Sequence, residues 1–405
     1  MSTSILYHGF GATTYHYQKT EYQKGSLIFH LKKKPDKQRC VACKSRDVTR
    51  QGRRFLKVRT VPFGAKPVFL GLHLHRLKCR NCKSYRQESR DLTLPRKSYT
   101  RQLTRLVVDL AEKMTLADLS RYLCLDWQIV KEIVKSNLQR REKARCWKNV
   151  RLIAVDEIAV RKGHRYMTIV VDLETGMVLD AVEGREADCL KPVFHRLIRE
   201  GAPFEAVAMD MSPAYRKAVA EYARPSTKIV HDPFHLVQAL NRMVDEVRRN
   251  EHLRLLNQGV DHIKGNRFLL LHAREKLIAD PNKTKRLETM LQLNQNLNKA
   301  YLLKEDFRQF WSLNQKRQAA DFLDTWLVQA KSLPLPAVQK LAKSIAKHRD
   351  SILSWYDYPI SNGPLEGLNN KIKVLKRRAY GYRDTAFFRL LILFLHNKPF
   401  RLLGV

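Results

Sequence analysis

Two C-x2-C pairs place the strongest constraint on what this chain can fold into. The four cysteines are Cys40, Cys43, Cys79 and Cys82. Two such pairs can surround one tetrahedral Zn²⁺ ion with four thiolates. The 35 residues between the pairs alternate in the manner of strands over residues 53–59 and 68–74. The spacing therefore predicts a zinc ribbon, which is a small sheet held by metal, with a redox pair or unrelated surface thiols as the alternatives.

The chain is strongly basic, and the charge is concentrated toward its N-terminal end. It has 76 Lys and Arg against 39 Asp and Glu, a formal net charge of +37, and 44% of its residues are apolar. Residues 1–150 contain 34 basic and 11 acidic side chains, a net charge of +23. A net charge of about 2–8 keeps a small domain in solution. We therefore expect a folded protein with a polyanionic partner such as nucleic acid, with solubility alone as the alternative.

Three cations alternate along the first predicted strand and share one of its faces. They are Arg53, Lys57 and Arg59. We expect them to contact phosphates, with an ordinary solvated face as the alternative. His73 and His75 lie on one face of the second predicted strand. Since four thiolates already complete the zinc site, we expect these histidines to be strand-face residues rather than ligands.

Cysteine usage and hydropathy indicate the compartment. The cysteine count of seven is odd, and the N-terminus has no basic stretch followed by an apolar one. Both features favour the reducing cytoplasm. The longest apolar run, Phe387 to Leu395, contains Arg389 and is shorter than the ~18–20 residues of a membrane span. We therefore expect a cytoplasmic protein that does not enter a membrane.

After the second cysteine pair the pattern changes to a helical period. Helices are expected over residues 100–113, 116–123 and 127–138, with Thr115 and Asp126 as N-caps of the last two. Two short helices joined by about three residues are typical of a helix-turn-helix, whose last helix enters the major groove of DNA. A plain three-helix bundle is the alternative. The side chains that we expect on DNA are Gln128, Lys131, Lys135, Arg140 and Arg141.

From residue 151 onward, strands and helices alternate. Apolar strands are expected over residues 152–156, 166–171, 177–182, 206–210 and 228–231, and helices over 187–200, 213–223 and 233–249. Three hairpin-type strands followed by alternating helices and strands indicate an α/β fold in the ribonuclease-H-like order. Residues 251–358 show helical patterns without strands, and we expect them to form an all-α insertion in this core.

Two of the expected strands end in an acid, Asp156 and Asp210. If these strands are neighbours, both carboxylates emerge at the edge where open α/β sheets bind ligands. Mg²⁺ prefers carboxylate oxygens, and two ions about 3.5–4 Å apart can activate a nucleophile and stabilise a leaving oxygen in phosphoryl transfer. A single acid at a strand end is more often a cap or turn residue. Two of them in a basic chain favour a metal site.

A third acid lies in a helix that we expect to begin at Asn362 and Pro364. Glu366 shares one face of this helix with Lys373 and Arg377. An acid among cations on an exposed face suits a metal ligand beside a DNA backbone, and we expect the two cations to contact that backbone. The alternative role for Glu366 is a favourable interaction with the helix dipole.

Several motifs together resemble the DDE transposases of bacterial insertion sequences, specifically the ISL-three family. They are the cysteine pairs, the helix-turn-helix, and the segments at residues 154–157, 209–215, 231–237 and 361–371. The resemblance implies that Asp156, Asp210 and Glu366 are the catalytic metal ligands, and that a helical insertion separates the second from the third. Asp232 and His235 match a D-x-x-H element of related transposases and are expected to support the site. A helix cap is the alternative role of Asp232, and the N-terminal 30 residues match nothing specific.

The resemblance implies a multidomain transposase. The expected domains are 1–96 for the N-terminal segment and zinc ribbon, 97–148 for the helix-turn-helix, 149–250 with 359–405 for the catalytic core, and 251–358 for the insertion. The protein would bind the terminal inverted repeats of its element in double-stranded DNA, and would use two Mg²⁺ or Mn²⁺ ions to cleave 3′ ends and join them to target DNA. We expect structural Zn²⁺, a homodimer or higher oligomer on DNA, and a nucleoid-associated protein of the bacterial cytoplasm. The alternatives are a DNA-binding regulator with an inactive core, and a metal-dependent nuclease without strand transfer.

Overall fold

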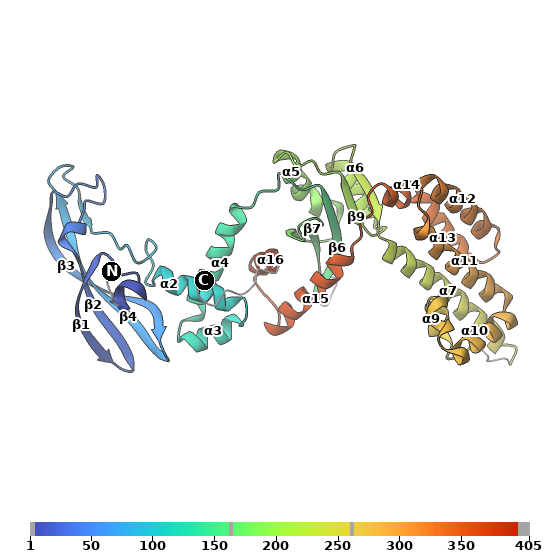
Figure 1. Ribbon diagram of the computed structural model, residues 1–405, viewed down its shortest axis with the longest axis horizontal. Helices are drawn as coiled ribbons and strands as arrows, with labels where there is room; N and C mark the ends of the chain where they lie inside the picture. Colours follow the sequence, from blue (N-terminus) through green and yellow to red (C-terminus); the bar gives the residue numbers. More distant parts are fainter. Residues whose placement is uncertain (1–4, 162–164, 260–262, 396–405) are drawn as a thin grey trace. The chain divides into compact units, whose positions relative to one another are not determined.

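The computed structural model describes residues 5–161, 165–259 and 263–395. This part of the chain divides into two compact units, which are adjacent in sequence at Ala144 and Arg145. Figure 1 shows that the first unit contains a sheet followed by helices, and that the second contains a sheet followed by a long series of helices. None of the described helices is both long and apolar enough to cross a bilayer.

The first unit contains a five-stranded sheet in the order β1-β2-β4-β3, with β5 paired to β4. Its elements are α1 (Ile5–His8), β1 (Tyr15–Gln23), β2 (Ser26–Lys33), η1 (Pro35–Lys37), β3 (Val48–Phe63), β4 (Lys66–Cys79) and β5 (Tyr85–Gln87). β2 and β4 pair in parallel, and the other neighbours pair antiparallel. The two predicted strands lie inside β3 and β4. The strands β1 and β2 were not predicted, although they complete the sheet.

One face of this sheet is packed with aliphatic side chains. Leu31, Leu70 and Leu72 are almost fully buried there. Leu6 and Phe10, which precede β1, belong to the same core. Because side chains alternate along a strand, the neighbours of these leucines in sequence point to the opposite face of the sheet.

Three helices complete the first unit, namely α2 (Arg101–Ala111), α3 (Leu116–Leu123) and α4 (Trp127–Lys143). Thr115 and Asp126 are N-caps, as predicted, because their side chains accept hydrogen bonds from backbone amides of the first helical turn. Cys124 ends α3 with a left-handed φ of 49°, which turns the chain toward α4. Arg140 and Arg141 lie inside α4 rather than in a tail after it.

The structure corrects the expectation for Arg59. This side chain is buried, with a relative exposure of 7%, and its guanidinium donates to the carbonyl oxygens of Val68 at 3.1 Å and Leu123 at 2.9 Å. The second acceptor belongs to the last turn of α3, where carbonyls have no partner within the helix. Arg59 therefore joins the sheet to the helices and does not contact phosphates.

The second unit contains a five-stranded sheet in the order β10-β9-β6-β7-β8. The strands are β6 (Leu152–Arg161), β7 (Arg165–Asp172), β8 (Val178–Glu183), β9 (Ala206–Met209) and β10 (Lys228–His231). β6, β7 and β8 form an antiparallel meander, while β9 and β10 join β6 in parallel. The two strands predicted to end in acids are therefore neighbours. The prediction that the first of them ends at Asp156 was wrong, because β6 continues to Arg161 and Asp156 pairs with Ile169 of β7 inside it, whereas Asp210 directly follows β9.

Helices on this sheet bury its apolar residues. They are η2 (Ala187–Leu190), α5 (Lys191–Arg199), α6 (Pro213–Tyr222), α15 (Gly363–Arg378) and α16 (Thr385–Leu393). The long helix α7 (Pro233–Leu256), which was expected in this core, instead buries its apolar residues among the helices that follow it. Val155, Phe194 and Val207 lie in one core between strands and helices. α15 packs against β6 and α16 packs against β8. In α16, the Nε of Arg389 lies 2.7 Å from an Asp180 carboxylate oxygen.

The segment between α7 and α15 is helical in its described part, as predicted. Its elements are α8 (Arg267–Leu271), α9 (Arg274–Ile278), α10 (Pro281–Leu293), α11 (Gln295–Arg308), η3 (Gln309–Ser312), α12 (Lys316–Ser332), α13 (Pro336–Lys347), α14 (Arg349–Leu353) and η4 (Ser354–Tyr356). Phe307, Phe310 and Trp326 are buried at its centre. α14 and η4 pack against β10, so these helices share contacts with the sheet.

Candidate catalytic edge and cysteine cluster

Asp156 and Asp210 lie just beyond the point where the parallel pairing of β6 with β9 stops. Asp156 is inside β6, paired with Ile169 of β7, and Asp210 directly follows β9. The parallel ladder of β6 and β9 ends at the pair Ala154 and Ala208, and each acid lies two residues further along. Asp156 is half-buried. Burial raises the pKa of its carboxyl, and the nearby charge of Asp210 also raises it, while a backbone amide and His235 act in the opposite direction. A bound cation would relieve the cost of a negative charge at this position.

Asn369 of α15 and Asn362, the N-cap of this helix, attach it to β6. The Nδ2 of Asn369 donates to Oδ2 of Asp156 at 2.8 Å, and the Nδ2 of Asn362 donates to the carbonyl oxygen of Val155 at 3.1 Å. The Oδ1 atoms of both asparagines are buried and have no hydrogen-bond partner among the described residues. The amide nitrogen of Asn369 therefore fixes Oδ2 of Asp156, and the amide oxygen of the same side chain lies next to this contact.

No sequence pattern had assigned a role to Asn369. It shares the buried stripe of α15 with Leu365 and Ile372, at helical spacing. A polar side chain inside an apolar stripe is a signal that it has a buried partner. This signal was present in the sequence, but it does not name Asp156 as the partner.

Glu366 lies in the first turn of α15 and is exposed. Among the described residues, four cysteines form the one group of three or more potential ligands whose donor atoms all lie within 4.8 Å of one another. The carboxylates of Asp156, Asp210 and Glu366 therefore do not meet at that distance. The structure brings the first two acids to one edge and places the third on the helix that packs against β6.

Asp232 and His235 lie at the start of α7, close to the same edge. Asp232 is buried and caps the helix by accepting a hydrogen bond from the amide of Phe234 at 3.2 Å, which is the alternative role considered for it. His235 Nε2 lies 3.9 Å from the Asp232 carboxylate. Burial raises the pKa of Asp232. Burial also raises the pKa of Glu157, next to Asp156, although Arg185 lowers it.

The predicted DNA contacts lie on several surfaces. On α4, Gln128 and Arg140 are exposed, and three neighbours are partly buried, namely Lys131, Lys135 and Arg141. On β3, Arg53 is exposed and Lys57 is half-buried. On α15, the exposed face that includes Glu366 also carries Lys373 and Arg377. All of these side chains reach the surface of their own unit, whereas Arg59 of β3, also predicted to contact DNA, is buried.

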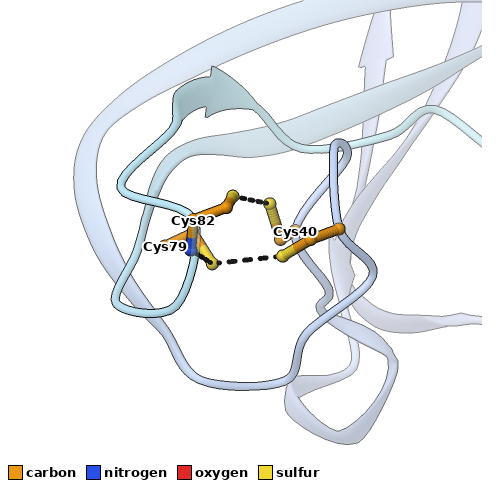
Figure 2. Close-up of side chains that lie close together, drawn as sticks. Cys40, Cys79 and Cys82 are labelled. Carbon is orange, nitrogen blue, oxygen red and sulfur yellow. Dashed lines mark hydrogen bonds between the residues drawn. The ribbon is translucent and has the colours of Figure 1, made fainter.

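The four cysteines of the two C-x2-C pairs come together beside the first sheet. Their sulfur atoms all lie within 4.8 Å of one another, with Cys40 and Cys82 at 3.5 Å and Cys43 and Cys79 at 3.5 Å. Figure 2 shows the thiols of Cys40, Cys79 and Cys82 turned toward one another. A tetrahedral zinc site with Zn–S bonds of about 2.3 Å separates its sulfurs by about 3.8 Å. The donor set and its spacing therefore fit zinc.

The two cysteine pairs have the same backbone turn. The amide of Cys40 donates to the carbonyl of Ser45, and the amide of Cys79 donates to that of Ser84, both at 2.9 Å. The Ser84 hydroxyl lies 3.1 Å from the Cys40 sulfur and lowers the pKa of that thiol to about 5. At Cys40 this favours the thiolate form that binds metal. At Cys43 a hydrogen bond from the Ser45 backbone acts in the same direction, but hydrogen bonds with the other three thiols outweigh it and raise the pKa to about 11. The two predicted strand-face histidines, His73 and His75, lie outside this cluster.

Comparison with known proteins identifies the family. Residues 153–392 match a family model described as a transposase, of the ISL-three (ISL3) type. The chain is also 32% identical over 340 residues to the transposase for insertion sequence element IS1001 of Bordetella parapertussis, which covers 83% of each chain. The chain belongs to the ISL-three family of DDE transposases. Membership of this family implies an enzyme of phosphoryl transfer on DNA.

Other similarities of this transposase are weaker. It is 29% identical over 260 residues, 58% of each chain, to the transposase for element IS1557 of Mycobacterium tuberculosis. A solved Drosophila P element transposase strand transfer complex covers 73% of this chain and 92% of its own, at 12% identity and a TM-score of 0.36. That score is too low to support a shared fold.

Proposed function

We propose that this ISL-three transposase binds the terminal inverted repeats of its insertion sequence, cleaves their 3′ ends and joins them to target DNA. The observation that carries the proposal is the parallel pairing of β6 with β9, after whose last pair Asp156 and Asp210 each follow by two residues. The meander followed by two parallel strands supports a ribonuclease-H-like core. Glu366, on the helix that packs against β6, is the proposed third catalytic acid.

The residues at this edge fit divalent cations. Asp156 and Asp210 offer the hard carboxylate oxygens that Mg²⁺ and Mn²⁺ prefer. We propose that these two acids and Glu366 hold two such ions, which when bound would polarise the scissile phosphate and activate the attacking oxygen. His235 and Asp232 would support the site from the start of α7, where His235 lies within electrostatic reach of Asp156.

The first unit supports the proposed recognition of DNA ends. The cysteine cluster would hold structural Zn²⁺, and α4 would contact the repeats through its exposed polar side chains. We also propose the domain boundaries given by the sequence, with a zinc ribbon to residue 96 and a helix-turn-helix to residue 148. Because the two ends of one element must be joined to the same target, a homodimer or higher oligomer on DNA is the proposed assembly, in the nucleoid of a bacterial cytoplasm.

The test of the proposed function uses purified protein, DNA that carries the element ends, target DNA and Mg²⁺. Sequencing of the products should show cleaved 3′ ends joined to the target. Cleaved ends without joints would indicate a nuclease, and specific binding without cleavage would indicate a regulator with an inactive core.

We expect Asn369→Leu to weaken Mn²⁺ binding and strand transfer by about 10- to 100-fold, as is usual when a group that orients a metal ligand is removed. Leucine keeps the size of the side chain but cannot donate to the Asp156 carboxylate. Calorimetric titration of Mn²⁺ into the protein measures the first effect directly. Val374→Ala, at an exposed position of the same helix, is the matched control and should leave both quantities unchanged. Wild-type Mn²⁺ affinity in Asn369→Leu would show that Asn369 does not orient Asp156.

A further inference from the structure

The sheet of the first unit has an exposed face opposite its aliphatic core. The strand register puts Lys19, His30, Gly71 and Lys57 in one row across β1, β2, β4 and β3. The next row contains His16, Lys32, His73 and Phe55. Residues paired across strands point to the same face of a sheet. These two rows, called here the cationic face, contain lysines, aromatic rings and a glycine, and they contain no acid.

Three rings pack together at the centre of the cationic face. The ring centroids of His30, Phe55 and His73 are 5.2 to 5.5 Å apart. His30 is buried and held from two sides, because its Nδ1 lies 3.1 Å from Nε2 of His73 and its Nε2 lies 3.0 Å from a Glu21 oxygen. The ring of Phe55 is supported by this pair, and 49% of the Phe55 residue remains exposed.

Gly71 makes room for the Phe55 ring. A Cβ atom at position 71 would lie 2.8 Å from Cε2 of Phe55, which is closer than real Cβ contacts. The ring therefore lies against the backbone of β4 in the space that a side chain would fill. An aromatic ring that rests on a strand in this way presents apolar surface to whatever binds the sheet.

Several cations of this face lie close to the His73 ring. Burial lowers the pKa of His73, and the positive charges of His30, Lys19, Lys32 and Arg53 lower it further. Lys57 lies on the other side of Phe55 along β3 and reaches the Gln23 side chain of β1 at 3.4 Å. The nearest acid on this face, Glu21, is engaged by His30. The face thus places lysines near an exposed ring, and its nearest acid in the described structure is already paired with His30.

We propose that the cationic face binds an unpaired DNA strand, with phosphates on Lys19, Lys32 and Lys57 and a base stacked on Phe55. A cationic surface with a central aromatic ring is the arrangement that binds single strands, because every base has a face that can stack. A duplex could contact the lysines, but its bases are stacked on each other and are not available to Phe55. The proposal deepens the proposed function, on which it rests, by separating strand binding on the sheet from duplex recognition by α4.

The experiment measures fluorescence anisotropy with the full-length protein, using an oligothymidylate of about 16 nucleotides and a duplex of the same length. Phe55→Ala should weaken binding of the single strand by about 5- to 100-fold, the range seen when one stacked base is lost. It should leave duplex affinity within about twofold. Phe55→Tyr keeps the ring and should restore single-strand binding. Phe63→Ala is the matched control, because Phe63 is a 54% exposed phenylalanine at the end of the same strand, outside the cationic face.

The lysines are tested by salt dependence. The double variant Lys19→Gln with Lys32→Gln should reduce the slope of log K against log salt for the single strand by about 1.4, since each phosphate contact contributes about 0.7. Equal effects of Phe55→Ala and Phe63→Ala, or equal losses for single strand and duplex in Phe55→Ala, would overturn the proposal. Thermal unfolding of each variant shows whether it is folded. If the wild-type protein stacks the single strand through Phe55 but does not join element ends, the proposed function fails and this inference stands.

Discussion

Asp156→Asn, Asp210→Asn and Glu366→Gln should each reduce end cleavage and strand transfer by several orders of magnitude and leave binding of element ends nearly intact. Each substitution keeps the size of the side chain and removes the negative charge that a divalent cation requires. Loss of one ligand would displace a metal ion, whose charge must stabilise the phosphate and the nucleophile together. Gel assays with labelled ends and Mg²⁺ measure the chemistry, and mobility shifts measure binding.

Binding should survive these substitutions, or become tighter, because an acid that faces the phosphate backbone repels it. In Asp156→Asn the remaining side-chain oxygen can still accept the hydrogen bond from Asn369, so the contact between α15 and β6 is preserved. Asp232→Asn and His235→Ala are the comparison variants. They should have milder effects, because Asp232 caps α7 and His235 acts on the site through its charge.

Glu366 gives this prediction its sharpest test. It is exposed, and its carboxylate does not meet those of Asp156 and Asp210 at ligand distance in the described structure. Efficient strand transfer by Glu366→Gln would show that the third ligand lies elsewhere. Glu157, which adjoins Asp156, and Asp232 would then be the next candidates.

Local sequence patterns were sufficient to predict the acidic edge and the helices. An apolar run followed by an acid occurs over residues 152–156 and again over residues 206–210, and each pattern is short enough to be recognised without knowledge of its partners. The pattern located the end of β9 next to Asp210, but it did not reveal that β6 continues past Asp156 to Arg161, where its pairing with β7 extends the strand. Thr115 and Asp126 could be assigned as caps because a cap depends on the first turn of its own helix. These features depend on residues close together in sequence.

Features that depend on distant partners could not be predicted. β1 carries exposed polar and aromatic residues at a sheet edge, so it has little apolar alternation, and β2 pairs in parallel with the non-adjacent strand β4. Arg59 alternates along its strand with apolar residues, as a surface cation would. It is nevertheless buried, because its guanidinium donates to the carbonyl of Leu123 in a helix packed on the strand. Asn369 could be placed on a helix face, but its bond to Asp156 joins residues far apart in the chain.

The cysteine cluster connects the segment before β3 to the end of β4. Structural zinc contributes about 10–16 kcal/mol of apparent binding free energy in zinc-finger peptides, so its loss can unfold the surrounding turns. In this chain the two equivalent turns at Cys40 and Cys79 hold the four sulfurs together. Since β4 pairs with both β2 and β3, disorder at its end would reach the strands that carry the residues proposed to contact DNA.

Purified protein should therefore contain one tightly bound Zn²⁺ per chain, and Cys43→Ser should lose it. A serine hydroxyl does not replace a thiolate as a zinc ligand at neutral pH, and the three remaining thiols leave the tetrahedral site incomplete. Elemental analysis measures the metal, and mobility shifts should show at least about a tenfold loss of end binding, the lower range for disrupted metal sites. Cys146→Ser, at an exposed cysteine outside the cluster, is the matched control and should retain zinc. Normal zinc content in Cys43→Ser would end the zinc ribbon hypothesis, because no other group of described residues offers four thiolates to one ion.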